Sequence, residues 1–183
     1  YGGKDIETLV ARLGDRLSDT FMLADIGMKE VGLLLKNGKI EDVLAPGSRK
    51  LYWKGHVALE VQRLSLVEGI QMDEDVMRRL RQMGVLERFS VAVNVPTESV
   101  GLLFVDGKLS RAMQPGAYAF WNFQKNISAE VMDLRVQSVE VSGQELLTKD
   151  KVSLRVNLAA SVRVIDAVAA RTKVAKYGDY LYR

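Results

Sequence analysis

The chain has 183 residues, a length that suits one large domain or two small ones. Its 48% hydrophobic and 27% charged residues are typical of a globular protein, and its net charge of +3 is too small to indicate nucleic-acid binding. The absence of cysteine excludes disulfides, thiolate metal ligands and cysteine nucleophiles. No apolar run reaches the roughly 18 residues that cross a bilayer, so we expect any membrane anchor to lie outside this sequence.

The first predicted element is an amphipathic helix, which we place with a linker in residues 1–28. Its apolar residues recur at helical spacing: Ile6, Leu9, Val10, Leu13 and Leu17. The sequence leaves open whether this helix packs on the following sheet or docks on a neighbouring subunit.

An internal repeat follows. Residues 31–47 align without a gap with residues 100–116, and eight of the 17 aligned positions are identical. A one-residue gap then aligns Trp53 with Trp121. Further on, three residues of the first copy, Glu60, Val61 and Leu64, align with Glu130, Val131 and Leu134. Turn dipeptides recur in any β-protein, but they do not explain the shared tryptophan.

Each copy is predicted to be a small three-stranded antiparallel meander. Asn37-Gly38 and Asp106-Gly107 supply the positive-φ residues of a tight hairpin turn. A Pro-Gly turn in each copy then reverses the chain into an aromatic strand. The aromatic residues of these strands are Tyr52, Trp53, Phe120 and Trp121. Their equivalent places favour packing under each sheet over a role as membrane-interface anchors.

Between the copies, residues 73–84 are predicted to form a short helix. Its apolar stripe consists of Val76, Leu80 and Met83, and Asp73 and Gly84 are suited to its start and end. Residues 88–95 alternate as a strand, which Pro96 ends.

Four arginines in this region are the candidate contact residues for a partner or for lipid. They are Arg78, Arg79, Arg81 and Arg88. They form either the solvated face of a short helix or a site for acidic headgroups. Nucleic acid fits less well, because no exposed aromatic residues are interleaved with them.

After the second copy, apolar and polar residues alternate from Val152 to Val164, which predicts a long strand with one buried and one wetter face. A turn at residues 148–151 pairs it with residues 139–147. Asp166 then begins a helix that runs to about Lys176. The class is α+β, with an N-terminal segment (1–28), a first β-repeat subdomain (29–95) and a second repeat that leads into a further domain (96–183).

Three segments of the second half resemble a known family: VGLLFVDG at 100–107, QPGAYAFW at 114–121, and residues 136–157 with VSGQELLTKDKVS. Over residues 97–183 the sequence resembles SPFH proteins (stomatin, prohibitin, flotillin; band 7), and in particular their slipin-like bacterial branch. The resemblance implies a curved antiparallel sheet with helices, assembly into rings or cages on membranes, and association with membrane-bound proteases.

The resemblance therefore implies a membrane-associated scaffold at a bacterial inner membrane that forms homo-oligomers. Its other partners would be membrane lipids and a membrane protease, reached through segments outside this sequence, and nucleic acid would not be one of them. Two alternatives stay open. One is a soluble adaptor that binds acidic lipid or peptide through the arginine-rich helix, and the other is a protease component.

The residues themselves show no recognisable catalytic motif. His56 is the only histidine, and no acidic residue stands at a known motif spacing from it. Lys151 and Ser153 share one face of a strand, but Arg155 and Asn157 extend the same polar row, which favours a solvated face. We predict no enzyme, no catalytic residue, no cofactor and no metal site.

Overall fold

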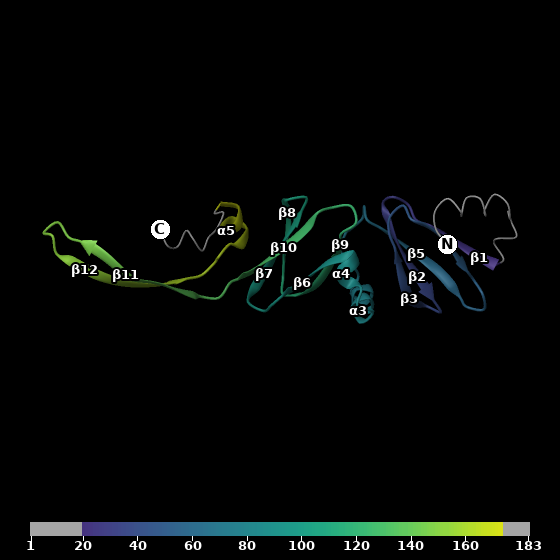
Figure 1. Ribbon diagram of the computed structural model, residues 1–183, viewed down its shortest axis with the longest axis horizontal. Helices are drawn as coiled ribbons and strands as arrows, with labels where there is room; N and C mark the ends of the chain where they lie inside the picture. Colours follow the sequence, from purple (N-terminus) through teal and green to yellow (C-terminus); the bar gives the residue numbers. More distant parts are fainter. Residues whose placement is uncertain (1–19, 174–183) are drawn as a thin grey trace. The chain divides into compact units, whose positions relative to one another are not determined.

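The chain has an α+β fold built mainly from antiparallel strands, in a computed structural model that describes residues 20–173 (Figure 1). Its strands are β1 (Phe21–Asp25), β2 (Glu30–Lys36), β3 (Lys39–Leu44), β4 (Arg49–Trp53), β5 (Leu59–Ser65), β6 (Ser90–Val95), β7 (Ser99–Val105), β8 (Lys108–Met113), β9 (Gly116–Trp121), β10 (Ile127–Asp133), β11 (Gln137–Leu147) and β12 (Ser153–Val162). Its helices are α3 (Glu74–Gln82), α4 (Leu86–Phe89) and α5 (Ala167–Lys173). The predicted fold class is confirmed. The helix predicted from Ile6 to Leu17 and the predicted helix end near Lys176 lie outside the described residues.

The chain divides into two units. Among the described residues, unit 1 holds 20–92 and 118–125, and unit 2 holds 93–117 and 126–173. The domain boundaries expected after residues 28 and 95 stay predictions.

Two sets of five strands pair in the same order. In the first strand set (β1–β5), β1 pairs with β4 and the other sheet has the order β3-β2-β5. In the second strand set (β6–β10), β6 pairs with β9 and the other sheet has the order β8-β7-β10. The meander pairing predicted for each copy is therefore wrong, because β4 pairs with β1 and not with β3. Beyond the turn at Pro46 and Gly47, the Ser48 carbonyl accepts the Ile26 amide at 3.0 Å. This hydrogen bond joins the residue before β4 to the residue after β1, so β4 enters the sheet of β1.

The sequence pattern missed strand β1, which lies in the stretch expected to be a linker. It pairs with β4 along its whole length, from Phe21 opposite Trp53 to Asp25 opposite Arg49. Strand β1 has five residues and comes directly after a helical pattern. Its alternation of apolar and polar residues is too short to predict a strand. Its partner, which is distant in sequence, supplies the hydrogen bonds that define it.

The two strand sets also share local details. The register shifts at equivalent places, after Leu34 in the β2–β3 pair and after Leu103 in the β7–β8 pair. Asn37 and Asp106 both have a φ of 51°, and the glycine after each has a φ of 75°. These are the positive-φ turns that the sequence predicted. The common strand order, register shift and turns support the predicted internal repeat.

The strand after the shared tryptophan shows where the sequence alignment slips. Both β5 and β10 begin at the sixth residue after the tryptophan. Glu60 is therefore equivalent to Ser128, and its predicted alignment with Glu130 is wrong by two residues. A slip of two residues keeps every side chain on the same face of a strand, so an alternating pattern does not reveal it.

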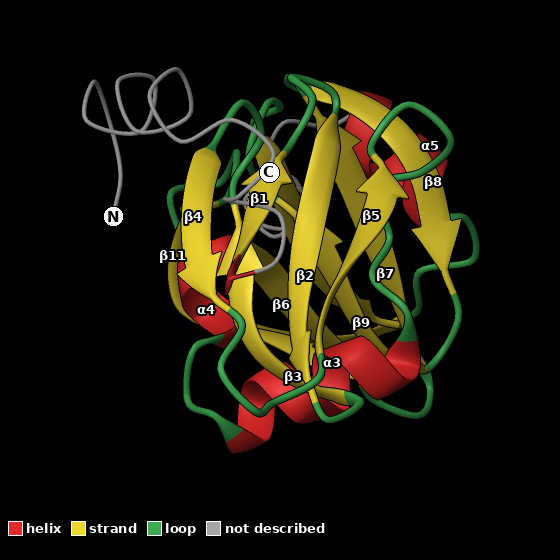
Figure 2. Ribbon diagram, turned by 90° about the vertical axis from the view of Figure 1, so that its right-hand side faces the viewer, coloured by secondary structure: helices red, strands yellow, loops and turns green. Residues whose placement is uncertain are grey.

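Helix α3 packs against the β3-β2-β5 sheet of unit 1, and in the view of Figure 2 it crosses the lower ends of β2 and β3. The helix predicted at residues 73–84 is confirmed. The Asp73 carboxylate accepts the Asp75 amide at 2.9 Å, and Gly84, at a φ of 70°, follows the helix end. The buried residues of this core are Val31, Leu33, Val43, Leu66, Met72, Met77, Leu80, Leu86, Ala119 and Trp121.

The strand predicted at residues 88–95 begins later than expected. Its first two predicted residues belong to α4, and β6 starts at Ser90. The Ser90 hydroxyl donates to the Leu86 carbonyl at 2.8 Å and closes the helical turn. As predicted, the strand ends before Pro96.

In unit 2, helix α5 covers the β8-β7-β10 sheet. Asp166 begins this helix as predicted, because its carboxylate accepts the Ala169 amide at 2.9 Å. The buried residues of this core are Leu102, Met132 and Ala167, and Val100, Phe104, Leu109, Leu134, Val164 and Ala170 pack around them.

Strands β11 and β12 form a long two-stranded ribbon (Figure 1). The predicted turn between them is confirmed, since the Thr148 amide donates to the Val152 carbonyl at 2.9 Å and Lys151 has a φ of 62°. A bulge at Gly143 is held by the Asn157 side chain, which accepts the glycine amide at 3.0 Å. The predicted buried face of β12 is wrong. No side chain of this strand is buried.

Candidate interaction sites

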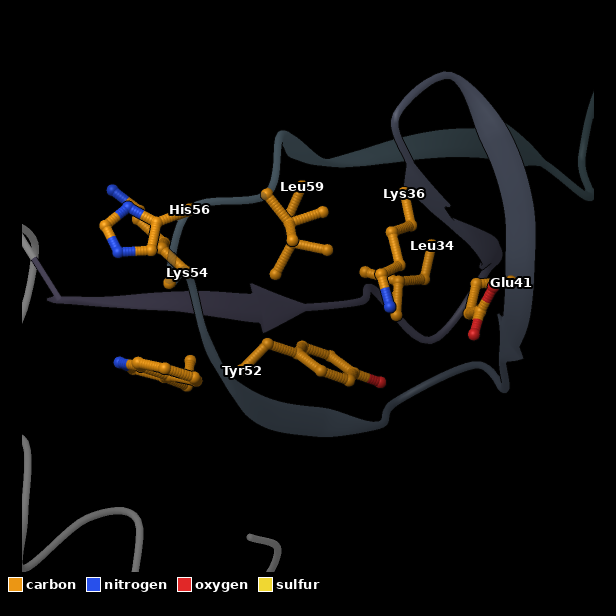
Figure 3. Close-up of a pocket in the computed structure, with 10 residues that line it drawn as sticks. Leu34, Lys36, Glu41, Tyr52, Lys54, His56 and Leu59 are labelled. Atoms are coloured by element: carbon orange, nitrogen blue, oxygen red, sulfur yellow. The ribbon is translucent and has the colours of Figure 1, made fainter.

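A cavity of about 540 Å³ opens in the first strand set of unit 1 (Figure 3). Its apolar lining includes Leu34, Leu59 and the ring of Tyr52, and Figure 3 shows Leu59 and Tyr52 between its two ends. Lys36 and Glu41 lie at one end of the cavity, and Lys54 and His56 lie at the other end. An apolar body with a few polar groups at its ends is typical of small-molecule sites.

The Tyr52 hydroxyl is the most unusual polar group of this cavity. It is buried, and it has no hydrogen-bond partner among the described residues. Burial, followed by the negative charge of Asp42, raises the pKa of Tyr52 to about 12. The hydroxyl therefore keeps its proton, and with it its ability to donate, to a higher pH than an ordinary tyrosine. Figure 3 shows it pointing toward the end where Lys36 and Glu41 lie.

Trp53 also lines the cavity, and 68% of its surface is exposed. The prediction that it packs under its sheet is wrong, whereas Trp121 is 3% exposed and does lie in the core. Phe123 explains part of this difference in exposure, because its ring stacks on Trp121 with the ring centroids 6.0 Å apart. Gly55 occupies the corresponding position after Trp53 and has no side chain to cover the indole.

The cavity is not apparent in the sequence pattern, although the two aligned copies differ in charge at positions that line it. Lys36 aligns with Val105, and Lys54 aligns with Asn122 once the tryptophans are matched. A charged residue that is present in only one copy of a repeat is a candidate for a binding site in that copy.

The residues considered for catalysis are exposed. His56 lies in the turn between β4 and β5. Lys151 belongs to the turn before β12, and Ser153 is the first residue of that strand. Among residues 20–173 there is no group of three or more histidine, cysteine or acidic residues that would hold a metal.

Two of the four predicted contact arginines form ion pairs or hydrogen bonds within the chain. Arg78 lies 2.9 Å from Asp75 and 3.7 Å from Glu74, in exposed ion pairs along the helix. The Arg79 Nε donates to the Ile40 carbonyl at 3.2 Å and so ties α3 to β3. Arg79 is therefore a structural residue of unit 1.

The other two arginines are exposed. Arg81 lies in the last turn of α3, and the Arg88 guanidinium lies 5.2 Å from the ring centroid of Phe89. A role in contact with a partner or with lipid stays a prediction for both.

In unit 2, an ion pair fastens α5 to its sheet. The Glu130 carboxylate accepts two hydrogen bonds from Arg171, at 2.6 and 2.9 Å. This bidentate bond lowers the pKa of Glu130 below its ordinary value. The same guanidinium lies 5.6 Å from the ring centroid of Phe104, which adds a cation–π contact.

The ribbon presents an unpaired apolar face. Leu154, Val156 and Leu158 alternate along β12 and share this face, since side chains two residues apart point the same way. Val139 joins them from β11, opposite Ala160. Leu154 is 49% exposed and Leu158 is 63% exposed. We call these residues the ribbon face.

Comparison with known proteins identifies the second half of the chain. Residues 93–182 match the model of the SPFH domain / Band 7 family, and this range contains β7, β8, α5 and the whole ribbon. This segment belongs to the SPFH (Band 7) family. The SPFH segment thus carries the ribbon face and the ion pair of Arg171, whereas the cavity lies outside it.

Named relatives agree with this assignment. A stomatin homologue of Pyrococcus horikoshii is 39% identical over 77 residues, which cover 42% of this chain and 28% of the relative. A stomatin homologue of Pyrococcus abyssi matches to the same extent. An uncharacterised protein of Archaeoglobus fulgidus is 36% identical over 77 residues, which cover 42% of this chain and 30% of that protein. The matched part therefore spans less than a third of each of these relatives. No solved structure matches the chain.

SPFH proteins are generally membrane-associated scaffolds, and as a family they are generally not enzymes. Within residues 20–173, no helix has the length and apolar character needed to span a bilayer.

Proposed function

We propose that this chain is a non-enzymatic scaffold domain that forms homo-oligomers through its ribbon face, within a protein of the bacterial inner membrane. In this proposal the assembled domain regulates a membrane protein, such as a membrane protease. The SPFH match and the generally membrane-associated character of the family support the scaffold role. The exposed ribbon face is the observation that carries the oligomer.

The ribbon should be more stable when another chain covers its apolar face. An isolated two-stranded ribbon is at best marginally stable in water, so strands as long as β11 and β12 gain from a further packing partner. Both strands also have an unpaired edge among the described elements, which offers backbone donors and acceptors to another chain. A second copy supplies a matching apolar face and a matching edge, as in a two-fold symmetric interface.

The substitution Leu158→Asp tests the oligomer directly. Full burial of a leucine stabilises by about 1.5–3 kcal/mol, so covering a side chain that is 63% exposed contributes about 1–2 kcal/mol. A symmetric dimer contains this contact twice, and the substitution should weaken dimerisation by roughly 30-fold to 1,000-fold. Sedimentation velocity over a concentration series measures the change.

Ser161→Asp is the matched control, because it adds the same charge to the opposite, exposed face of β12. It should leave the dissociation constant within about threefold. Equal sedimentation of the two variants would refute the ribbon face as the interface. Recovery of the complete protein as a soluble monomer after fractionation of native cells would refute the membrane scaffold itself.

A further inference from the structure

The cavity of unit 1 carries charges that the second strand set lacks at equivalent positions. Lys36 corresponds to Val105, and Lys54 corresponds to Asn122. Glu41 contributes the one carboxylate of the lining, which leaves a formal charge of one positive with histidine neutral. The lining therefore favours a ligand with a net negative charge.

Aromatic surface is exposed at the same place. Gly55, at a φ of 52°, lies against the indole of Trp53, since a Cβ built on it would come within 3.3 Å of the ring. In the second strand set, Phe123 stacks on Trp121 instead, and Trp121 is buried. The first set thus leaves open an aromatic surface that the second set covers. Such a surface suits the apolar body of a ligand.

The Tyr52 hydroxyl is a hydrogen-bond donor that has no acceptor among the described residues. The equivalent residue is Phe120, which is fully buried and has no hydroxyl. A buried hydroxyl without a partner destabilises the fold. Figure 3 shows it pointing toward the end of the cavity where Lys36 lies, which makes these two groups the candidate donors for an acidic group there.

We propose that this cavity binds a single-chain anionic amphiphile, an unbranched apolar chain that ends in a phosphate or a carboxylate. The acidic group accepts from the Tyr52 hydroxyl and from Lys36. The chain lies along Leu34 and Leu59 and reaches the exposed ring of Trp53. The cavity volume of about 540 Å³ is within the usual range for such sites.

Tryptophan fluorescence reports this binding, because Trp53 is exposed and Trp121 is buried. The probe is dodecyl phosphate below its micellar concentration, added to the whole chain. A saturable blue shift of the emission is expected, and it should be absent from Trp53→Phe. Inorganic phosphate lacks the chain and dodecyltrimethylammonium carries the opposite charge, so neither should give the shift. Vesicles of phosphatidylglycerol show whether the same site also takes an anionic lipid from a membrane.

Substitution toward the second strand set tests the geometry. Tyr52→Phe keeps the ring and removes the donor, and it should weaken binding of dodecyl phosphate by about tenfold or more. Lys36→Val should weaken it by about threefold to tenfold, and Glu41→Gln should tighten it by about twofold to fivefold. Lys39→Ala, a surface lysine outside the cavity, should leave the affinity unchanged within about twofold.

Circular dichroism of each variant separates loss of binding from loss of fold. Equal binding of the cationic amphiphile would overturn the proposal, and so would unchanged affinity in a folded Tyr52→Phe variant. Because the cavity lies outside the SPFH segment, failure of this test leaves the ribbon-face oligomer untouched, and the reverse also holds.

Discussion

Gly101→Ala should destabilise unit 2, because strand β7 passes too close to its neighbours for a side chain at this position. A Cβ built on Gly101 would lie 2.7 Å from the Cγ2 of Val95 and 2.8 Å from the Cε of Met113. The methionine end can rotate away, but valine is stiff at χ1 and Val95 is buried. Overpacking of this kind costs about 1–3 kcal/mol. In a chain of this size, the loss should lower the Tm by roughly 2–10 °C.

Thermal unfolding followed by circular dichroism measures the effect, and Gly69→Ala is the control. Gly69 has no atom within 4 Å of its built Cβ and no positive φ. Alanine there restricts the unfolded chain and should leave the Tm unchanged or slightly higher. The equivalent Gly32→Ala should behave like Gly101→Ala, because its Cβ would meet the Cδ1 of Ile26 at 2.5 Å. A Gly101→Ala variant as stable as the control would refute the close approach described for β7.

Three further predictions follow from named contacts. The folded pKa of Glu130 is lowered by Arg171, so the stability from this pair is present above the ordinary value of 4.5 and is lost as pH falls through the lowered one. Hydrogen exchange of the α5 amides between pH 6 and pH 3 should show this loss, and Glu130→Gln should remove it. The folded pKa of Tyr52 is raised from 10.0 to about 12, so the folded state keeps its proton longer and stability falls as pH rises through this window. Urea unfolding of Tyr52→Phe should therefore show a smaller alkaline loss. Arg79→Met should cost about 1 kcal/mol in urea unfolding through its lost bond to β3, whereas Arg78→Met, in an exposed pair, should cost less than about 0.5 kcal/mol.

The same sheet face is covered by a helix in both strand sets, but the two helices come from different positions along the chain. In unit 1 the covered residues are Val31, Leu33, Leu35 and Ile40, and in unit 2 they are the equivalent Val100, Leu102, Phe104 and Leu109. Helix α3 follows β5 after a short connection, whereas the whole ribbon stands between β10 and α5. An apolar sheet face needs a cover, and each unit provides one at the same place.

Local chemistry explains what the sequence predicted well. Asn37 and Asp106 stand before glycines, and such pairs form tight turns wherever they are placed. Asp73 and Gly84 bound a helix because capping depends on groups within a turn of each other. The SPFH resemblance rests on a similarly local string of residues around the turn at 148–151, and the family match covers it.

Pairing and burial depend on distant partners, and there the sequence was ambiguous. Nothing near β4 indicates that it leaves β3 for β1. The candidate arginines look alike in sequence, yet Arg79 is tied to the carbonyl of Ile40 and Arg81 faces solvent. The cavity was missed for the same reason, since Lys36 and Tyr52 come together only when two sheets meet.

The amino-acid sequence alone therefore determined the turns, the capped helix, the fold class and the family, because each depends on residues that are close together along the chain. Only the tertiary structure decided that Trp121 is core and Trp53 is surface, although both end a strand of the same aromatic pattern. Burial is a property of what packs against a side chain, and that neighbour is Phe123 in one case and Gly55 in the other.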